Sequence, residues 1–176
     1  MPSPEPPTLA QTHRSALLVV AADAIAAGLD TGTPLEPVLD GFPPELRAIR
    51  ATFVTLKREG ELRGCIGSSN PSRPLVLDVA VNAFGAAFRD PRFPALSQAE
   101  RAGLEISISV LSEREEMAFA SQADLQGQLR PGIDGLLMEL DQHRGTLLPS
   151  VWAMLPAATF LLQLKRKAGL ADGFWS

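Results

Sequence analysis

Apolar and polar positions along the chain predict helices and short strands in mixed order. Residues 12–27 are rich in alanine and other apolar residues, which predicts a helix with a wide buried face. Apolar residues at helical spacing also follow Pro74 and recur over 157–168. Segment 51–56 is β-branched and aromatic, and 104–110 alternates apolar with polar, so both are predicted strands. Ser97 and Glu100 form the Ser-x-x-Glu pattern of a capping box, which predicts that a short helix begins there.

The helix predicted after Pro74 has two faces of different character. Its polar residues Asp78, Asn82 and Arg89 fall on one side, which predicts a solvent-exposed face. The opposite face is expected to enter the core, and it carries Val76, Val79, Ala80, Ala83, Phe84 and Ala87.

The connections between the predicted elements indicate the fold class. A polar turn at 57–61 makes the first two strands a hairpin, and 133–140 and 145–148 form a second pair. These connections are too short for parallel crossovers, so we expect an α+β fold, mainly an antiparallel sheet with flanking helices. The proline-rich residues 1–10 predict a flexible tail, and 11–176 a single domain.

Composition narrows the class of protein. A net charge of -4 argues against a nucleic-acid partner, because such proteins usually present a basic face. No apolar run reaches the roughly 18 residues that a membrane span needs, since Asp23 interrupts the best stretch. One cysteine cannot form an internal disulfide, which favours a cytoplasmic location. One cysteine and two histidines make no zinc-ligand pattern, so we expect neither metal nor cofactor.

The stretch 61–67 contains the single cysteine and is the strongest candidate for a site. As a regular strand it would point Leu62 and Ile66 into the core. Arg63 and Cys65 would then share the other face, with Cα atoms roughly 7 Å apart. A guanidinium at that distance favours the thiolate, which is the reactive form of cysteine.

Several interpretations of this stretch stay open. Cys65 is a nucleophile, a redox-sensing thiol or an inert core residue, and only His13 and His143 are available as imidazole bases. The glycines at 64 and 67 leave bare backbone for a ligand or for another chain segment. Arg63 binds an anionic ligand or pairs with a carboxylate.

The loop after the second helix, 89–94, offers further candidates. It is stiffened by two prolines and contains Asp90 and Arg92. These two residues either pair with each other, with Phe93 in the core, or contribute to the rim of a binding cleft. We expect a structural role with contact to the cleft.

Several ordered motifs resemble the AMMECR domain family. The resemblance covers nearly the whole chain except about the first ten residues. Its motifs are Leu-Arg-Gly-Cys-Ile-Gly at 62–67, Ala-Phe-Arg-Asp-Pro-Arg-Phe-Pro at 87–94, Leu-Glu-Ile-Ser-Ile-Ser-Val-Leu at 104–111, Gly-Ile-Asp-Gly-Leu at 132–136, Leu-Leu-Pro-Ser-Val-Trp at 147–152 and Lys-Ala-Gly-Leu at 167–170.

The resemblance implies a compact α+β domain of two lobes, with the cysteine motif lining a cleft between them. More narrowly, the chain resembles the A component of the AmmeMemoRadiSam group, which implies Memo-like and radical-SAM protein partners. No catalytic mechanism comes with the family. The first hypothesis is therefore an accessory or binding module for a small ligand or a partner, and the alternative is an enzyme that uses a thiolate in group transfer or modification. The candidate cleft residues are Arg63, Gly64, Cys65, Gly67, Asp90 and Arg92.

Overall fold

The chain folds into two compact units that meet in sequence between Glu113 and Arg114. The computed structural model describes residues 9–175, without the side chains of residues 157 and 158. All but the last two positions of the predicted flexible tail lie outside the described residues. We refer to residues 9–113 as the N-terminal unit and to 114–175 as the C-terminal unit. A single domain over 11–176 stays a prediction, as does a cleft between lobes.

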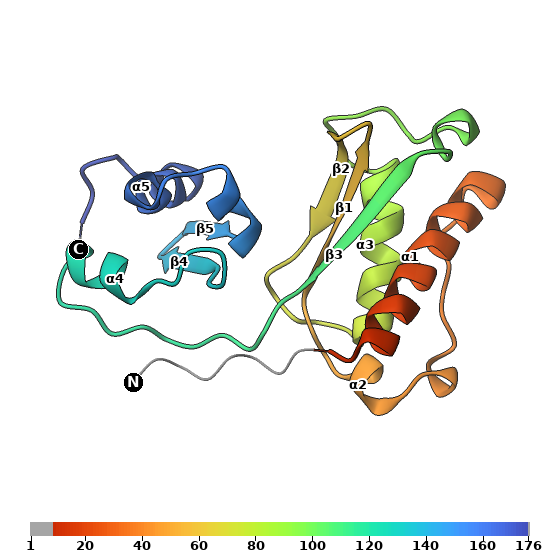
Figure 1. Ribbon diagram of the computed structural model, residues 1–176, viewed down its shortest axis with the longest axis horizontal. Coiled ribbons are helices and arrows are strands. Elements are labelled where there is room, and N and C mark those ends of the chain that lie inside the picture. Colours follow the sequence, from red (N-terminus) through yellow and green to blue (C-terminus); the bar gives the residue numbers. More distant parts are fainter. Residues whose placement is uncertain (1–8, 176) are drawn as a thin grey trace. The chain divides into compact units, whose positions relative to one another are not determined.

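The N-terminal unit is a three-stranded antiparallel sheet with two long helices on one face (Figure 1). The strand order is β2-β1-β3, so the strand that carries the cysteine lies at an edge. Buried side chains from both long helices and from the sheet form one apolar core. The elements are α1 (Gln11–Thr31), η1 (Leu39–Gly41), α2 (Pro44–Arg47), β1 (Thr52–Arg58), β2 (Glu61–Gly67), α3 (Leu75–Phe88), η2 (Gln98–Glu100) and β3 (Leu104–Val110).

The C-terminal unit is a two-stranded antiparallel hairpin packed with short helices around its own small core. Phe160, Leu161 and Leu164 of its last helix are fully buried, as the amphipathic pattern predicts. The elements are α4 (Gln122–Gln128), β4 (Leu136–Leu140), β5 (His143–Leu147), η3 (Pro149–Ala153) and α5 (Ala157–Lys167). The α+β class and the antiparallel pairing predicted from the sequence are therefore confirmed.

Two element boundaries differ from the prediction. Helix α1 does not stop at Gly28 but continues to Thr31, and Gly32 with φ 71° follows it. Gly28 therefore lies inside the helix, and its role is packing. A Cβ at this position would come within 2.3 Å of the Phe88 ring, so the glycine permits close packing against α3. The second hairpin turns at residues 141–142, which places His143 in β5 rather than in the turn.

The polar face predicted for α3 is wrong at two positions. Asp78 and Asn82 are buried, at 4% and 6% exposure. Asp78 Oδ2 accepts hydrogen bonds from the Thr52 main-chain N–H (2.9 Å) and hydroxyl (2.6 Å), and Asn82 Nδ2 donates to the same hydroxyl (2.9 Å). These side chains fix the start of β1 against α3, since buried polar groups need such partners. Only Arg89 of the predicted polar face is exposed.

Helix α1 is, among the described residues, the one helix long and apolar enough to cross a membrane by length and composition. Its apolar character has a local explanation, because a stripe of small and aliphatic side chains packs into the core of the N-terminal unit. A core helix of a globular unit has these properties. The absence of a membrane partner stays a prediction.

Candidate functional site

The cysteine motif forms edge strand β2, and the strand is not regular. Cys65 lies opposite Thr55 of β1, but the register shifts so that Leu62 pairs with Lys57 and Gly64 with Leu56. Arg63 is therefore the extra residue of a β-bulge. Because cross-strand partners share a face, the bulge places Leu62 on the Cys65 face, 40% exposed.

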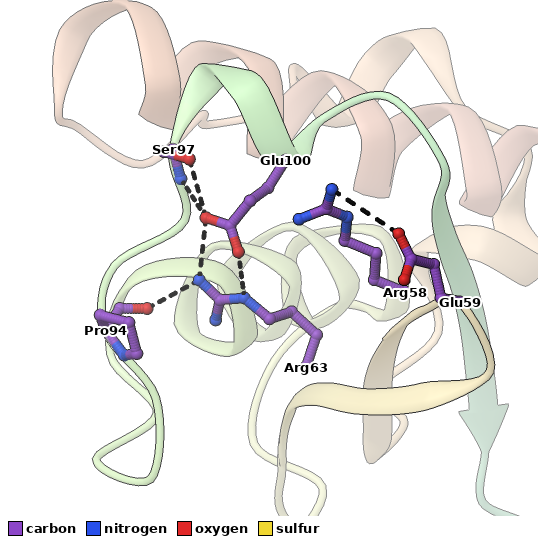
Figure 2. A network of polar contacts seen from close by, with 6 residues as sticks. All are labelled: Arg58, Glu59, Arg63, Pro94, Ser97 and Glu100. Carbon is purple, nitrogen blue, oxygen red and sulfur yellow. Dashed lines mark hydrogen bonds and ion pairs between the residues drawn. The ribbon is translucent and has the colours of Figure 1, made fainter.

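The predicted distribution of side chains over the two faces is thus only half correct. Ile66 packs against the core as expected. Leu62 does not, and it occupies the face that alternation assigned to Arg63. The Arg63 side chain is buried, and its guanidinium points at Glu100 and the Pro94 carbonyl in the segment after α3 (Figure 2). Alternation fails here because one inserted residue inverts the faces beyond it.

Both glycines of the motif are in close contact with backbone of the same unit. A Cβ at Gly64 would lie 2.1 Å from the Ala86 carbonyl oxygen on α3. A Cβ at Gly67 would lie 2.3 Å from the Thr52 carbonyl oxygen. Of the two predicted uses for bare backbone, the structure therefore shows the approach of another chain segment. The glycines let β2 pack tightly on its neighbours.

Arg63 is held by a carboxylate from the segment before β3 (Figure 2). Its Nε donates to Glu100 Oε1 at 2.7 Å, and its Nη2 donates to Glu100 Oε2 at 3.3 Å and to the Pro94 carbonyl at 2.9 Å. Ser97 donates its main-chain N–H and its hydroxyl to Glu100 Oε2, which confirms the predicted capping box. Hydrogen bonds from Arg63 first, and then from Ser97, lower the pKa of Glu100 to about 2.

Asp90 and Arg92 occupy the place of a neighbouring strand at the sheet edge. The Cys65 N–H donates to Asp90 Oδ2 at 2.8 Å, and Arg92 Nη2 donates to the Cys65 carbonyl at 3.3 Å. Arg92 also holds Asp90 through Nε (3.0 Å) and Nη2 (2.7 Å). Side chains of the loop thus satisfy the main chain of an edge strand.

The charge state of this pair follows from its contacts. The Asp90 side chain is 2% exposed, and burial alone would raise its pKa. The hydrogen bond from Arg92 has the larger effect and holds the pKa of Asp90 well below its ordinary range. Asp90 in turn raises the pKa of Arg92. The predicted pairing of these two residues is confirmed, and both remain charged.

The thiol lies on the sheet face away from the long helices. Cys65 is half-buried, and its Sγ is 3.3 Å from the Thr55 hydroxyl. Within the N-terminal unit His13 lies on α1, on the other face of the sheet. His143 belongs to the C-terminal unit, where its Nδ1 is 2.9 Å from the Ala168 carbonyl. Among the described residues, the side chain within hydrogen-bond reach of the thiol is therefore a hydroxyl and not a base.

The structure brings together Cys65, Asp90 and Arg92, and it directs Arg63 elsewhere. Sequence reasoning missed the roles of Glu100 and Thr55. The Ser-x-x-Glu pattern marks Glu100 as a capping residue, but it gives no sign that Glu100 also pairs with Arg63. These two residues lie 37 positions apart in the chain. Cross-strand register placed Thr55 beside the thiol. Within residues 9–175, no three His, Cys, Asp or Glu side chains converge as a metal site would require.

Comparison with known proteins agrees with this architecture. A family model described as AMMECR1 matches residues 18–176. A protein of Methanothermobacter thermautotrophicus is 40% identical over 134 residues, which cover 74% of this chain and 69% of that protein. A protein of Thermococcus onnurineus is 36% identical over 167 residues, covering 90% and 80%. The crystal structure of the uncharacterized protein PH0010 from Pyrococcus horikoshii superposes with a TM-score of 0.84 at 34% identity, covering 93% of this chain and 83% of that one.

Proposed function

The chain belongs to the AMMECR1 family, and from this premise we propose that it is an accessory binding module of the cytoplasm. The surface around Cys65 is its binding surface. Memo-like and radical-SAM proteins are the partners, and a small ligand held at the same surface is part of the complex. These partners are the ones that the resemblance of the motifs implies, and the geometry of the N-terminal unit supports this surface.

One observation carries the choice of binding over catalysis: the motif uses its own charges internally. Arg63 is paired with Glu100, and Asp90 holds both the Cys65 N–H and Arg92. A cysteine nucleophile needs a base within hydrogen-bond reach, and the contact of this thiol is the Thr55 hydroxyl. The network supports a rigid recognition surface better than an acid–base reaction.

The proposed surface presents three kinds of group. Cys65 offers a half-buried thiol and Thr55 a hydroxyl beside it. The Arg92 side chain is 53% exposed, although its Nε and Nη2 are engaged by Asp90. A group with acceptor oxygens, such as a carboxylate, fits this combination. Since Asp90 holds the arginine in place before binding, little side-chain freedom is lost when a partner binds.

Binding of the purified chain to Memo-like and radical-SAM proteins of the same genome tests this proposal. We expect Arg92→Gln to weaken binding more than about tenfold, or 1.4 kcal/mol. Cys65→Ser should retain binding, because serine keeps the size and a hydrogen-bonding group. Arg58→Gln is the matched control, since Arg58 is a partly exposed arginine of the same sheet.

Isothermal titration measures these affinities, and circular dichroism confirms that each variant is folded. If the wild-type chain binds neither partner, the proposed function is wrong. If Arg92→Gln and Arg58→Gln bind equally well, the surface has been placed on the wrong part of the sheet.

A second candidate function is an enzyme that uses the Cys65 thiolate. It is favoured by Arg92, whose guanidinium donates to the carbonyl of Cys65 and so places a cation beside this residue. Iodoacetamide tests it, because the thiolate displaces iodide and Cys65 is the only thiol. Labelling that slows at least tenfold in Arg92→Gln, together with lost cellular function in Cys65→Ser, would support the enzyme. Equal labelling of both chains would contradict it.

A further inference from the structure

The C-terminal unit contains an apolar pocket that is separate from the cysteine motif. Its volume is about 130 Å³, and it lies between the hairpin, the last helix and the residues that end the chain. Since all of its lining belongs to the C-terminal unit, nothing about it rests on the proposed function. Its apolar lining consists of Phe119, Leu125, Met138, Leu140, Phe174 and Trp175.

The two charged residues at this pocket already have partners. Lys165 is 3% exposed, and its ammonium donates to Gln122 Oε1 (3.2 Å) and to the carbonyls of Asp172 (3.1 Å) and Phe174 (3.0 Å). Three acceptors use all three of its protons. Glu139 pairs with Arg144 at 3.1 Å and with Arg114 at 3.8 Å. A charged ligand would lose hydration here without gaining a free hydrogen-bond partner.

The remaining lining favours an aromatic ring. Phe119 and Trp175 are 44% and 38% exposed, and their ring centroids lie 5.6 Å apart at an interplanar angle of 54°. The Lys165 ammonium is 5.7 Å from the centre of the Trp175 ring, so a cation faces the aromatic side of the pocket. Apolar cavities of roughly 150 Å³ accept benzene, which sets the size of the occupant at about one ring.

We propose that this pocket binds a small uncharged molecule with a single aromatic ring. The ring packs on Phe119 and Trp175, with Met138 and Leu140 below it. Lys165 shapes the pocket indirectly, because its ammonium donates hydrogen bonds to the carbonyls of residues 172 and 174. These bonds hold residues 172–174 in place beside the ring.

Toluene is the probe, and the methionine methyl groups are the reporters. The chain has four methionines, of which Met138 lines the pocket and Met154 is 75% exposed outside it. In the full chain with ¹³C-labelled methionine methyls, toluene should shift the Met138 resonance through its ring current in a saturable way. The Met154 resonance should not move, and benzoate should need at least about ten times the concentration.

Variants locate the binding. Leu140→Trp fills the pocket and should abolish the Met138 shift, whereas Leu18→Trp makes the same change at an exposed leucine of α1 and should preserve it. Trp175→Ala changes a rim residue that is 38% exposed, and it should weaken toluene binding. This second variant tests the pocket even where Leu140→Trp fails to fold. No saturable Met138 shift, equal shifts at Met154, or an unchanged affinity in Trp175→Ala would overturn the proposal. Tighter binding of benzoate would overturn the uncharged class of ligand.

Discussion

Each unit of this protein buries one basic side chain, and the two are stabilised in different ways. Arg63 in the N-terminal unit is 9% exposed, and Lys165 in the C-terminal unit is 3% exposed. Arg63 is paired with the carboxylate of Glu100. Lys165 has only neutral acceptors, one amide oxygen and two main-chain carbonyls. One cation is therefore neutralised, and the other is solvated by dipoles of the protein.

The two side chains also differ in how completely they are satisfied. Arg63 Nη1 is, within the part of the chain that the structure describes, the one buried side-chain nitrogen or oxygen without a hydrogen-bond partner. The Lys165 ammonium uses all three donors. A planar guanidinium donates in fixed directions, whereas an ammonium rotates to meet its acceptors. Arg63 therefore joins β2 to the segment before β3 by charge and geometry, whereas Lys165 joins α5 to α4 and to residues 172–174 by hydrogen bonds to neutral groups.

Removal of Arg63 should have the largest effect. Arg63→Met leaves the Glu100 carboxylate, which is 23% exposed, without its opposite charge. Breaking a buried pair in this way costs about 3–5 kcal/mol, so we expect a loss of about 3 kcal/mol in the free energy of unfolding. Urea unfolding measures it. Arg58→Met is the matched control, because Arg58 is 40% exposed and 3.8 Å from Glu59 (Figure 2), and it should cost less than about 0.5 kcal/mol.

The double variant Arg63→Met/Glu100→Gln separates pairing from packing. Because no unpaired charge remains, it should recover part of the stability that Arg63→Met loses. If the double variant is no more stable than the single one, Arg63 acts through packing, and the contrast with Lys165 disappears.

Acid should weaken the N-terminal unit through the same pair. The pKa of Glu100 is about 2 in the folded chain, against its usual 4.5, so its contribution is present above pH 4.5 and lost as the pH falls towards 2. That difference corresponds to about 3 kcal/mol at most. Urea unfolding at pH 7 and pH 3 should show a smaller loss in Arg63→Met than in wild type. An equal loss in both would show that other carboxylates, such as Asp90, dominate the acid response.

Removal of Lys165 should have a smaller effect. Lys165→Met takes the donor from three neutral acceptors, and residues 172–174 can turn their carbonyls to solvent when released. We therefore expect a loss of about 2 kcal/mol. Lys167→Met replaces an exposed lysine of the same helix and should change stability little. Hydrogen exchange should rise in residues 172–174 of Lys165→Met, and exchange equal to wild type would contradict the anchoring role.

Ser97→Ala should have the smallest effect. It removes the hydroxyl donor to Glu100 but leaves the Ser97 main-chain N–H and Arg63 in place. Loss of such a cap costs about 1 kcal/mol. The pKa of Glu100 should move up towards its ordinary value, which titration of the Glu100 side-chain carbon by NMR can follow. A loss as large as that in Arg63→Met would mean that the cap, and not the arginine, holds the carboxylate.

The elements of the fold were largely predictable because their signals are local. Strand β3 has the predicted bounds, Leu104–Val110, since alternation of apolar and polar residues reports directly on a strand with one buried face. The capping pattern at Ser97 and Glu100 was also correct. The end of α1 was misplaced, because Gly28 serves contact with Phe88, a residue 60 positions away in the chain.

The candidate site was predicted as a location but not as an arrangement. The motif pointed to Cys65, and the stiff loop pointed to Asp90 and Arg92, which do meet at the edge of β2. The partner of Arg63 could not be found, because a single bulge inverts the faces and no composition signal marks it. Lys165 lies in the last turn of α5 beside the exposed Arg166 and Lys167, and nothing in the local sequence distinguishes it as the buried cation of the three.

By itself the sequence determined the class of the fold, the family, and the segment that holds the single cysteine, since periodicity and ordered motifs are properties of neighbouring residues. Only the tertiary structure decided which charged and polar groups meet. Arg63 with Glu100, Cys65 with Asp90, and Lys165 with the carbonyls of residues 172 and 174 all depend on how separate segments pack. The physical reason is that burial makes an unpaired polar group costly, so the final pairing is set by which groups the packing brings within reach.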